Sequence, residues 1–344
     1  MTRHGLIIGK FLPLHLGHRH LIETALTRCD ELTIVLFGRS VEPIPLAVRQ
    51  AWLAELFPAV RVVGGMDDHP VDFDDDDIWK HWIDATLAAF DSLDGRRPDV
   101  VFSSEEYGAE LARRLGADSE VVDLERTTVP VSGSLIRADP LGHWHVLDPP
   151  VRAWFAKRVA VVGAESTGKS TLCAHLADHF DTTWVPEYGR EYCEVRGLEA
   201  PWTSDEFEVI AARQLADEDA AAREANRVVI CDTDALATGI WHERYLHARH
   251  AEVEAMIRPY DLYLVTTPDV PWVDDGLRDS ADDREWMTDR FVEELDARGA
   301  RYELITGTWN DRDAAAIAAV ERVLAERWSG ATYHPEERNH HRRL

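Results

Sequence analysis

Short apolar runs alternate with helix-length segments along almost the whole chain, and this alternation constrains the fold more than any other feature. Apolar runs bounded by turn residues are typical of strands, and strands that alternate with helices predict parallel sheets covered by helices. We expect strands at residues 6–8, 32–37, 60–63, 99–102, 120–122, 158–162, 227–231, 261–266 and 301–306. We expect helices at residues 17–28, 46–57, 78–90, 105–115, 169–180, 204–226 and 311–328. The sequence therefore predicts an α/β protein.

The alternation stops once, near residues 147–150, because the adjacent prolines 149 and 150 can continue neither a helix nor a strand ladder. A length of 344 residues also suits two domains of ordinary size. We therefore predict two doubly wound parallel-sheet domains, residues 1–150 and 151–330. Residues 331–344 show no periodicity and are predicted to form a mobile tail.

The charge balance limits the kinds of partner. The chain has 63 acidic and 37 basic residues, and its formal net charge of −26 repels nucleic acid and anionic lipid. No apolar run approaches the roughly 20 residues that span a bilayer, no export signal precedes the first strand, and the four cysteines form no Cys-x-x-Cys pair. We expect a cytoplasmic protein that binds small molecules and neither nucleic acid nor membrane, as a monomer or a homo-oligomer.

The second half carries a phosphate-binding motif between an expected strand and an expected helix. Residues 163–171 read GAESTGKST and satisfy the pattern G-x-x-x-x-G-K-[ST]. Such a loop surrounds phosphates with backbone N–H groups, its lysine neutralises phosphate oxygens and its hydroxyl binds Mg²⁺. We predict that the loop binds ATP and Mg²⁺, with Ser170 as a metal ligand, through Gly163, Glu165, Ser166, Thr167, Gly168, Lys169, Ser170 and Thr171.

Acidic residues follow other strands of the same half. Asp232 and Asp234 come directly after an apolar run, at the strand end where doubly wound sheets bind ligands. We predict that Asp232 binds Mg²⁺, whereas Asp234 either binds the acceptor substrate or only caps a helix. Glu187, Tyr188 and Arg190 follow a short strand and are candidates for the acceptor site, with Glu187 as the base for a hydroxyl.

A charged segment between Asp274 and Arg284 is interpreted as a mobile lid. Arg278 and Arg284 could close on the transferring phosphate and exclude water. The alternative is an exposed loop of paired charges.

The first half carries a second kind of phosphate chemistry. Residues 9–18 read GKFLPLHLGH, so Lys10, His15 and His18 lie where the first strand leads into a helix. Two imidazoles three residues apart can face one ligand. They could donate hydrogen bonds to phosphate and stabilise a pyrophosphate leaving group. A metal site is the weaker alternative, because no third ligand is suggested at this spacing.

Residues 131–137 read VSGSLIR and complement that segment. Ser132, Ser134 and Arg137 open a helix and offer hydroxyl, N–H and guanidinium donors to another part of a triphosphate. Either segment alone could be ordinary helix capping. Together they predict a second nucleotide site.

These two segments resemble the H-x-G-H and S-x-S/T-x-I-R elements of the nucleotidyltransferase superfamily. With GAESTGKST and EYGREY in the second half, nearly the whole chain is similar to the NadR family of bifunctional nicotinamide-nucleotide adenylyltransferases and ribosylnicotinamide kinases. Some members begin with a helix-turn-helix that represses transcription. No such module fits before the first expected strand, so we expect no repressor role.

The resemblance implies ligand contacts in both domains. In the first domain it implies ATP bound by Gly9, Lys10, Phe11, His15, His18, Ser132, Ser134 and Arg137. It also implies a mononucleotide bound by Trp79, Arg49 and Arg126, with Trp79 stacked on the nicotinamide ring. Trp82 is the alternative for stacking, and either tryptophan could instead lie in the core. In the second domain it implies nicotinamide riboside bound by Glu187, Tyr188, Arg190 and Asp234.

The resulting hypothesis is NAD synthesis in two steps. The second domain transfers phosphate from ATP to the 5′-hydroxyl of nicotinamide riboside, with Lys169, Asp232 and Glu187 as catalytic residues. The first domain joins the product to ATP and releases pyrophosphate, using positioning and charge stabilisation by Lys10, His15, His18 and Arg137. Two alternatives remain: a pantetheine-phosphate adenylyltransferase fused to a dephospho-coenzyme A kinase, and a nucleotide-sensing regulator without catalysis.

Overall fold

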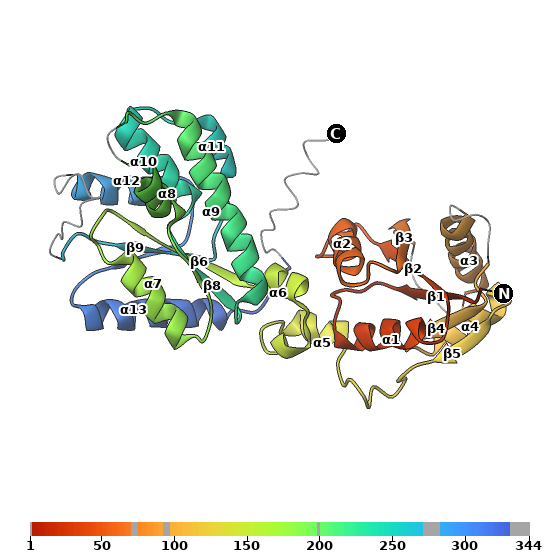
Figure 1. Ribbon diagram of the computed structural model, residues 1–344. Coiled ribbons are helices and arrows are strands. Elements are labelled where there is room, and N and C mark those ends of the chain that lie inside the picture. The colour runs from red at the N-terminus through yellow and green to blue at the C-terminus, as the bar shows by residue number, and fades with distance from the viewer. Residues whose placement is uncertain (1, 70–74, 92–96, 198–199, 271–282, 331–344) are drawn as a thin grey trace. The chain divides into compact units, whose positions relative to one another are not determined.

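The computed structural model describes residues 2–69, 75–91, 97–197, 200–270 and 283–330. The chain divides into two units, the first formed by the residues up to Val151 together with residues 328–330, and the second by residues 152–327. Each unit contains one five-stranded parallel sheet with helices packed on it (Figure 1). The predicted α/β class with two doubly wound sheets is confirmed.

The first sheet has the strand order β3-β2-β1-β4-β5, and all neighbouring strands are parallel. Its strands are β1 (His4–Gly9), β2 (Glu31–Gly38), β3 (Arg61–Met66), β4 (Val100–Ser103) and β5 (Asp118–Val121). Its helices are α1 (Leu16–Leu26), α2 (Leu46–Leu56), α3 (Asp76–Asp91), α4 (Tyr107–Leu115), α5 (Gly133–Ala138) and the 3₁₀ helix η1 (Trp144–Val146). The strand order reverses between β1 and β4, where such sheets bind ligands at the carboxyl ends of their strands.

The second sheet has the order β10-β9-β6-β8-β7 and is also parallel throughout. Its strands are β6 (Lys157–Gly163), β7 (Trp184–Val185), β8 (Val228–Asp232), β9 (Leu262–Thr266) and β10 (Tyr302–Ile305). Its helices are α7 (Lys169–His179), α8 (Tyr188–Arg196), α9 (Ser204–Glu224), α10 (Ala235–Leu246), α11 (Ala251–Met256), α12 (Arg284–Ala297) and α13 (Trp309–Leu324). The central position of β6 brings the loop that follows it to the middle of the sheet.

Apolar side chains on one side of each covering helix pack on the sheet and bury it. Helices α7 and α13 cover one face of the second sheet, and α9 and α10 lie on the other (Figure 1). Leu172, Leu176 and Val320 of the covering helices pack on Val159 and Ile230 of the strands, all fully or almost fully buried. This burial fixes the carboxyl ends of the strands, which carry the polar residues considered next.

Pro149 and Pro150 do not interrupt the structure but open α6 (Pro149–Phe155), which contains the boundary between the units. Proline is tolerated in the first turn of a helix because the N–H groups there have no intrahelical partner. Helices α10, α11 and α12 were not expected from the sequence pattern. No helix among the described residues has the length and apolar character needed to cross a membrane. The predicted tail, residues 331–344, lies outside the described residues.

Candidate active sites

The phosphate-binding loop of the second unit connects β6 to α7. Its backbone has positive φ angles of 145° at Gly163, 55° at Ser166 and 87° at Gly168. Glycine is required at the two ends, since a Cβ atom would lie 2.5 Å from the Thr266 carbonyl oxygen at Gly163 and 2.5 Å from the Trp309 ring at Gly168. A left-handed turn of this kind directs successive N–H groups toward one anion.

A cavity of about 680 Å³ opens beside this loop. Among the residues that the sequence singles out, its wall contains Glu165, Ser166, Thr167, Gly168, Lys169, Ser170, Thr171, Glu187, Tyr188, Arg190 and Asp232. Gly163 shapes the turn without lining the cavity. The structure thus brings the loop together with the carboxylates at the ends of β7 and β8.

The buried carboxyl group of Asp232 has the properties of a cation ligand. Its side chain is 1% exposed, and within the described residues no group donates a hydrogen bond to Oδ1. Burial, reinforced by the charge of Glu187, raises the pKa of Asp232 to about 7, although Lys169 and a hydrogen bond from Ser170 oppose the rise. A hydroxyl oxygen and a carboxylate are the ligands that Mg²⁺ prefers, so Ser170 and Asp232 fit that ion.

Gln214 of α9 joins the two sides of this site. Its Oε1 accepts a hydrogen bond from the backbone N–H of Tyr188 at 2.9 Å, and its Nε2 donates to the backbone carbonyl of Asp232 at 3.3 Å. The side chain is 1% exposed and lines the cavity. Gln214 therefore fixes the start of α8, next to Glu187, against the end of β8. Sequence reasoning missed Gln214, because in the sequence it is only a polar residue within a long expected helix.

Aromatic side chains form another part of the same wall. Trp202, Phe207, Trp241 and Tyr245 all line the cavity. The ring centroids of Trp202 and Tyr245 are 5.4 Å apart, and those of Trp241 and Tyr245 are 5.9 Å apart. A wall of this kind suits a planar aromatic ligand.

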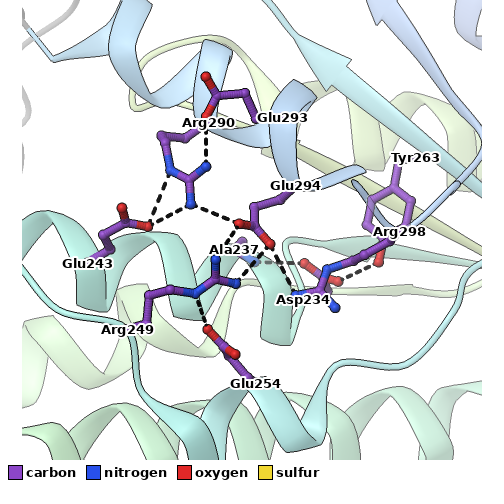
Figure 2. Close-up of polar contacts among 10 residues, drawn as sticks. All are labelled: Asp234, Ala237, Glu243, Arg249, Glu254, Tyr263, Arg290, Glu293, Glu294 and Arg298. Carbon is purple, nitrogen blue, oxygen red and sulfur yellow. Dashed lines mark hydrogen bonds and ion pairs between the residues drawn. The ribbon is translucent and has the colours of Figure 1, made fainter. Parts of the chain in front are cut away.

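Asp234 does not line the cavity. It is a fully buried N-cap of α10, where Oδ1 accepts a hydrogen bond from the Ala237 N–H at 2.9 Å and Oδ2 accepts one from the Tyr263 hydroxyl at 2.9 Å (Figure 2). Burial raises the pKa of Asp234 to about 6. The structure therefore assigns Asp234 to the helix-cap alternative and corrects its assignment to the acceptor site.

Of the two arginines predicted for a lid, Arg278 lies outside the described residues. Arg284, the first residue of α12, is 8% exposed and does not line the cavity. Its guanidinium donates to the backbone carbonyls of Val270 at 2.9 Å and Ser166 at 3.4 Å. In this conformation Arg284 holds the backbone of the phosphate-binding loop. Arg312 does the same, since it donates to the Thr167 carbonyl at 2.9 Å.

In the first unit, His15 and His18 lie at the start of α1. Nδ1 of His15 accepts a hydrogen bond from the Gly17 N–H at 3.1 Å, and the two imidazole rings stack with centroids 3.8 Å apart. Burial, followed by the charge of Arg126, lowers the pKa of His15 to about 4. Burial and the neighbouring His15 lower the pKa of His18 well below its usual value. Both rings are therefore neutral at pH 7 and act as hydrogen-bonding groups, not as cations.

The two predicted segments of the first unit meet through backbone contacts. Arg137 donates a hydrogen bond to the Leu12 carbonyl and another to the Ser134 hydroxyl, the latter at 3.2 Å. Gly133 is required at this contact, because a Cβ atom would lie 2.5 Å from the Leu12 carbonyl oxygen. Ser132 caps α5 by accepting from the Leu135 N–H at 3.3 Å.

A cavity of about 460 Å³ lies where these segments meet. Its wall contains Gly9, Lys10, Phe11, His18, Arg126, Ser132, Ser134 and Arg137 from the predicted set. His15 packs against His18 without lining the cavity. Nδ1 of His18 is buried and has no hydrogen-bond partner among the described residues, which leaves it able to bind a ligand.

Arg49 is not at the cavity wall. It is fully buried and donates to the Lys10 carbonyl at 2.6 Å and to a carboxylate oxygen of Glu42 at 2.7 Å. The other Glu42 oxygen lies 3.0 Å from Nζ of Lys10. Burial raises the pKa of Glu42, but a hydrogen bond from the Arg39 backbone and the two cations outweigh it and hold the pKa below its usual range. Arg49 and Glu42 therefore position the Lys10 turn, which corrects the assignment of Arg49 to the mononucleotide.

Arg39 instead supplies a guanidinium to the cavity from the end of β2. Its Nε is buried and has no hydrogen-bond partner in the described part of the chain. A buried guanidinium nitrogen without a partner is costly, and an anionic ligand would satisfy it. The sequence shows Arg39 only as one arginine in a turn.

The two tryptophans of α3 have different environments. Trp79 is 4% exposed and belongs to the apolar core with Leu6 and Val101. Trp82 lines the cavity, and its ring lies 6.2 Å from that of Tyr107. In this conformation the structure brings Trp82 and not Trp79 to the cavity wall, which contradicts the placement of Trp79 at the mononucleotide site.

Each unit thus has its own nucleotide-binding geometry: an H-x-G-H cavity on a doubly wound sheet, and a phosphate-binding loop with a buried carboxylate. This combination defines a two-domain enzyme that joins a nucleotidyltransferase to a kinase.

Comparison with known proteins specifies the class further. Residues 158–312 match the family described as an AAA domain. The chain is 32% identical over 347 residues to the trifunctional NAD biosynthesis/regulator protein NadR of Escherichia coli K12, an alignment that covers 93% of this chain and 82% of that protein. The chain belongs to the NadR family.

Two other similarities agree with this membership. Over 138 residues the chain is 30% identical to a nicotinamide-nucleotide adenylyltransferase of Saccharolobus solfataricus, covering 32% of this chain and 77% of that protein. A crystal structure of NadR protein in complex with NR has a TM-score of 0.78 and 24% identity, covering 97% of this chain and 99% of that one. The last similarity concerns the fold alone.

Proposed function

We propose that this protein makes NAD from nicotinamide riboside in two ATP-dependent steps, one in each unit. The second unit phosphorylates nicotinamide riboside to the mononucleotide, and the first unit adenylylates the mononucleotide. The observation that carries the proposal is the presence of two separate cavities, each with anion-binding groups and aromatic rings in its wall. The names of the relatives, NAD biosynthesis protein and nicotinamide-nucleotide adenylyltransferase, support the choice of substrate.

In the second unit, the aromatic wall around Trp202 and Tyr245 accommodates the nicotinamide ring, and the loop holds the ATP phosphates. The 5′-hydroxyl oxygen of the riboside forms a bond to the γ-phosphorus of ATP, and the bond between that phosphorus and ADP breaks. Glu187 accepts the proton of the hydroxyl. Lys169 lies at the loop, where its ammonium group balances the phosphate charge. Mg²⁺, held by Ser170 and Asp232, supplies further neutralisation of that charge when bound.

In the first unit, a phosphate oxygen of the mononucleotide attacks the α-phosphorus of ATP, and the bond to pyrophosphate breaks. No side chain has to remove a proton, because the phosphate is already a nucleophile. The neutral ring of His18 donates a hydrogen bond, whereas Lys10, Arg39, Arg126 and Arg137 balance the charge of the phosphates. Trp82 lies beside the ring of the mononucleotide.

The test is to incubate the purified protein with nicotinamide riboside and MgATP and to follow the products by chromatography. We expect mononucleotide first, then NAD together with pyrophosphate. Lys169→Met should yield no mononucleotide but should still form NAD from added mononucleotide. His18→Ala should accumulate mononucleotide without NAD; its intact kinase step shows that the second unit is folded, and circular dichroism and thermal unfolding check the first. Absence of both products from the wild-type protein would refute the proposal.

A further inference from the structure

A cluster of Asp67, His69 and His81 lies outside the groups used in either proposed step. Asp67 directly follows β3, His69 comes two residues later, and His81 belongs to α3. One ligand atom from each side chain lies within 4.8 Å of the other two. Across the described ranges, no other set of three histidine, cysteine or acidic side chains gathers in this way.

The carboxylate of Asp67 connects the two imidazoles. Its Oδ1 lies 2.7 Å from Nδ1 of His69, and its Oδ2 lies 3.1 Å from Nε2 of His81. The centroids of the two imidazole rings are 3.8 Å apart, and the ring planes are tilted by 37°. The Asp67 side chain is only 8% exposed, and its N–H donates to the Gly38 carbonyl at 2.8 Å, so the carboxylate is held in place.

This donor set indicates a particular class of ion. Two imidazole nitrogens and one carboxylate oxygen suit Zn²⁺, Co²⁺ and Ni²⁺, whereas Mg²⁺ prefers oxygen ligands alone. Three protein ligands also leave a coordination position open for water or substrate, as in catalytic zinc sites.

We propose that Asp67, His69 and His81 bind one divalent transition-metal ion of the Zn²⁺ class. The ion lies between the carboxylate and the two rings, and each neutral imidazole binds it through the ring nitrogen that faces Asp67. It crosslinks the end of β3 to α3. Because Asp67 and His69 also line the cavity of the first unit, an oxygen atom of a molecule in that cavity can reach the open position. Binding of the ion does not depend on the proposed reaction.

The test is titration of the full-length protein with Co²⁺ and with Zn²⁺ in the absence of nucleotide, so that no ion is bound through ATP. We expect one equivalent of Co²⁺ with visible absorption typical of mixed nitrogen and oxygen ligands, and one equivalent of Zn²⁺ by calorimetry. Asp67→Asn and His81→Gln should each weaken binding by about 10-fold or more.

His175→Gln is the matched control. Nδ1 of His175 lies 3.0 Å from Asp313, in a histidine–aspartate pair that gathers no third ligand among the described residues. This variant should bind the metal like the wild type. Zn²⁺ should raise the thermal unfolding temperature of the wild type and of His175→Gln, but not of the other two variants. Equal metal affinity in wild type and His81→Gln, or no stoichiometric binding by the wild type, would overturn the proposal.

Discussion

The guanidinium of Arg137 donates a hydrogen bond to the backbone carbonyl of Leu12, which lies 125 residues earlier in the chain. A second nitrogen of the same group donates to Ser134, so one planar side chain connects the turn after β1 to the first turn of α5. Gly133 makes this approach possible because it has no Cβ atom. The two halves of the adenylyltransferase cavity are therefore held together by a group that also lines it.

Replacement of Arg137 by lysine should show whether activity depends on the positive charge alone or also on the planar geometry of the guanidinium. Lysine keeps the positive charge but lacks the planar fork that serves two acceptors and a ligand at once. We expect Arg137→Lys to lower kcat for NAD formation from mononucleotide by about 10- to 100-fold and to leave riboside phosphorylation unchanged. Arg113→Lys, at an exposed pair with Glu110, is the control. Full adenylyltransferase activity in Arg137→Lys would show that charge alone is sufficient.

The fold and the phosphate-binding groups could be predicted because they depend on local sequence. Strand and helix periodicity identified the sheets, and the fixed spacing of Gly163, Gly168 and Lys169 identified a loop whose geometry is local. Likewise, the short segments around His18 and Arg137 each contain the residues that begin a helix. Such features change little with the rest of the chain.

The remaining site residues depend on tertiary packing. Arg39 and Arg49 are equivalent by composition, but Arg49 points into the core toward Glu42 while Arg39 ends at the cavity. Trp79 and Trp82 share one helix, and the rotation of that helix on the sheet decides which of them is buried. The aromatic wall of the cavity in the second unit is formed by side chains from separate elements, so no local sequence pattern predicts it.

The difference between Arg39 and Arg49 can be measured. Arg39→Gln removes from the cavity wall a guanidinium whose Nε has no partner among the described residues, so we expect an increase in KM for the mononucleotide of about 10-fold with little change in the unfolding temperature. Arg49→Gln removes the buried one of the two cations that contact Glu42, together with the donor to the Lys10 carbonyl, which should cost roughly 3 kcal/mol of unfolding free energy. Steady-state kinetics and thermal unfolding of both variants test the assignment. It fails if Arg49→Gln is as stable as the wild type and only its KM changes.

Stability should fall in mild acid because of His15. Its pKa is about 4 in the folded protein, below the value of about 6.5 in an unfolded chain. Between pH 6.5 and pH 4 the unfolded state binds more protons than the folded state. The free energy of unfolding therefore decreases as the pH falls from 6.5 toward 4. From pH 7 to pH 5 this amounts to about 2 kcal/mol. Asparagine can still cap α1 but cannot titrate. Urea denaturation of His15→Asn should therefore show a weaker pH dependence than the wild type, whereas identical profiles would contradict this explanation.

Asp232 and Asp234 are both buried and both have raised pKa values, but we assign Asp232 to the metal and Asp234 to a helix cap. Because the two side chains are otherwise alike, the same substitution at each position tests these different roles. The pKa of Asp232 is about 7 in the folded protein, so its ionisation destabilises the fold as the pH rises from about 4 to 7. At pH 8 without MgATP, Asp232→Asn should raise the free energy of unfolding by on the order of 1–2 kcal/mol and abolish kinase activity. Asp234→Asn keeps an acceptor for the Ala237 N–H, so its kinase activity should remain within about 3-fold of wild type. Riboside phosphorylation and thermal unfolding of the two variants check both expectations. Loss of kinase activity in a stable Asp234→Asn, with activity retained in Asp232→Asn, would reverse the two assignments.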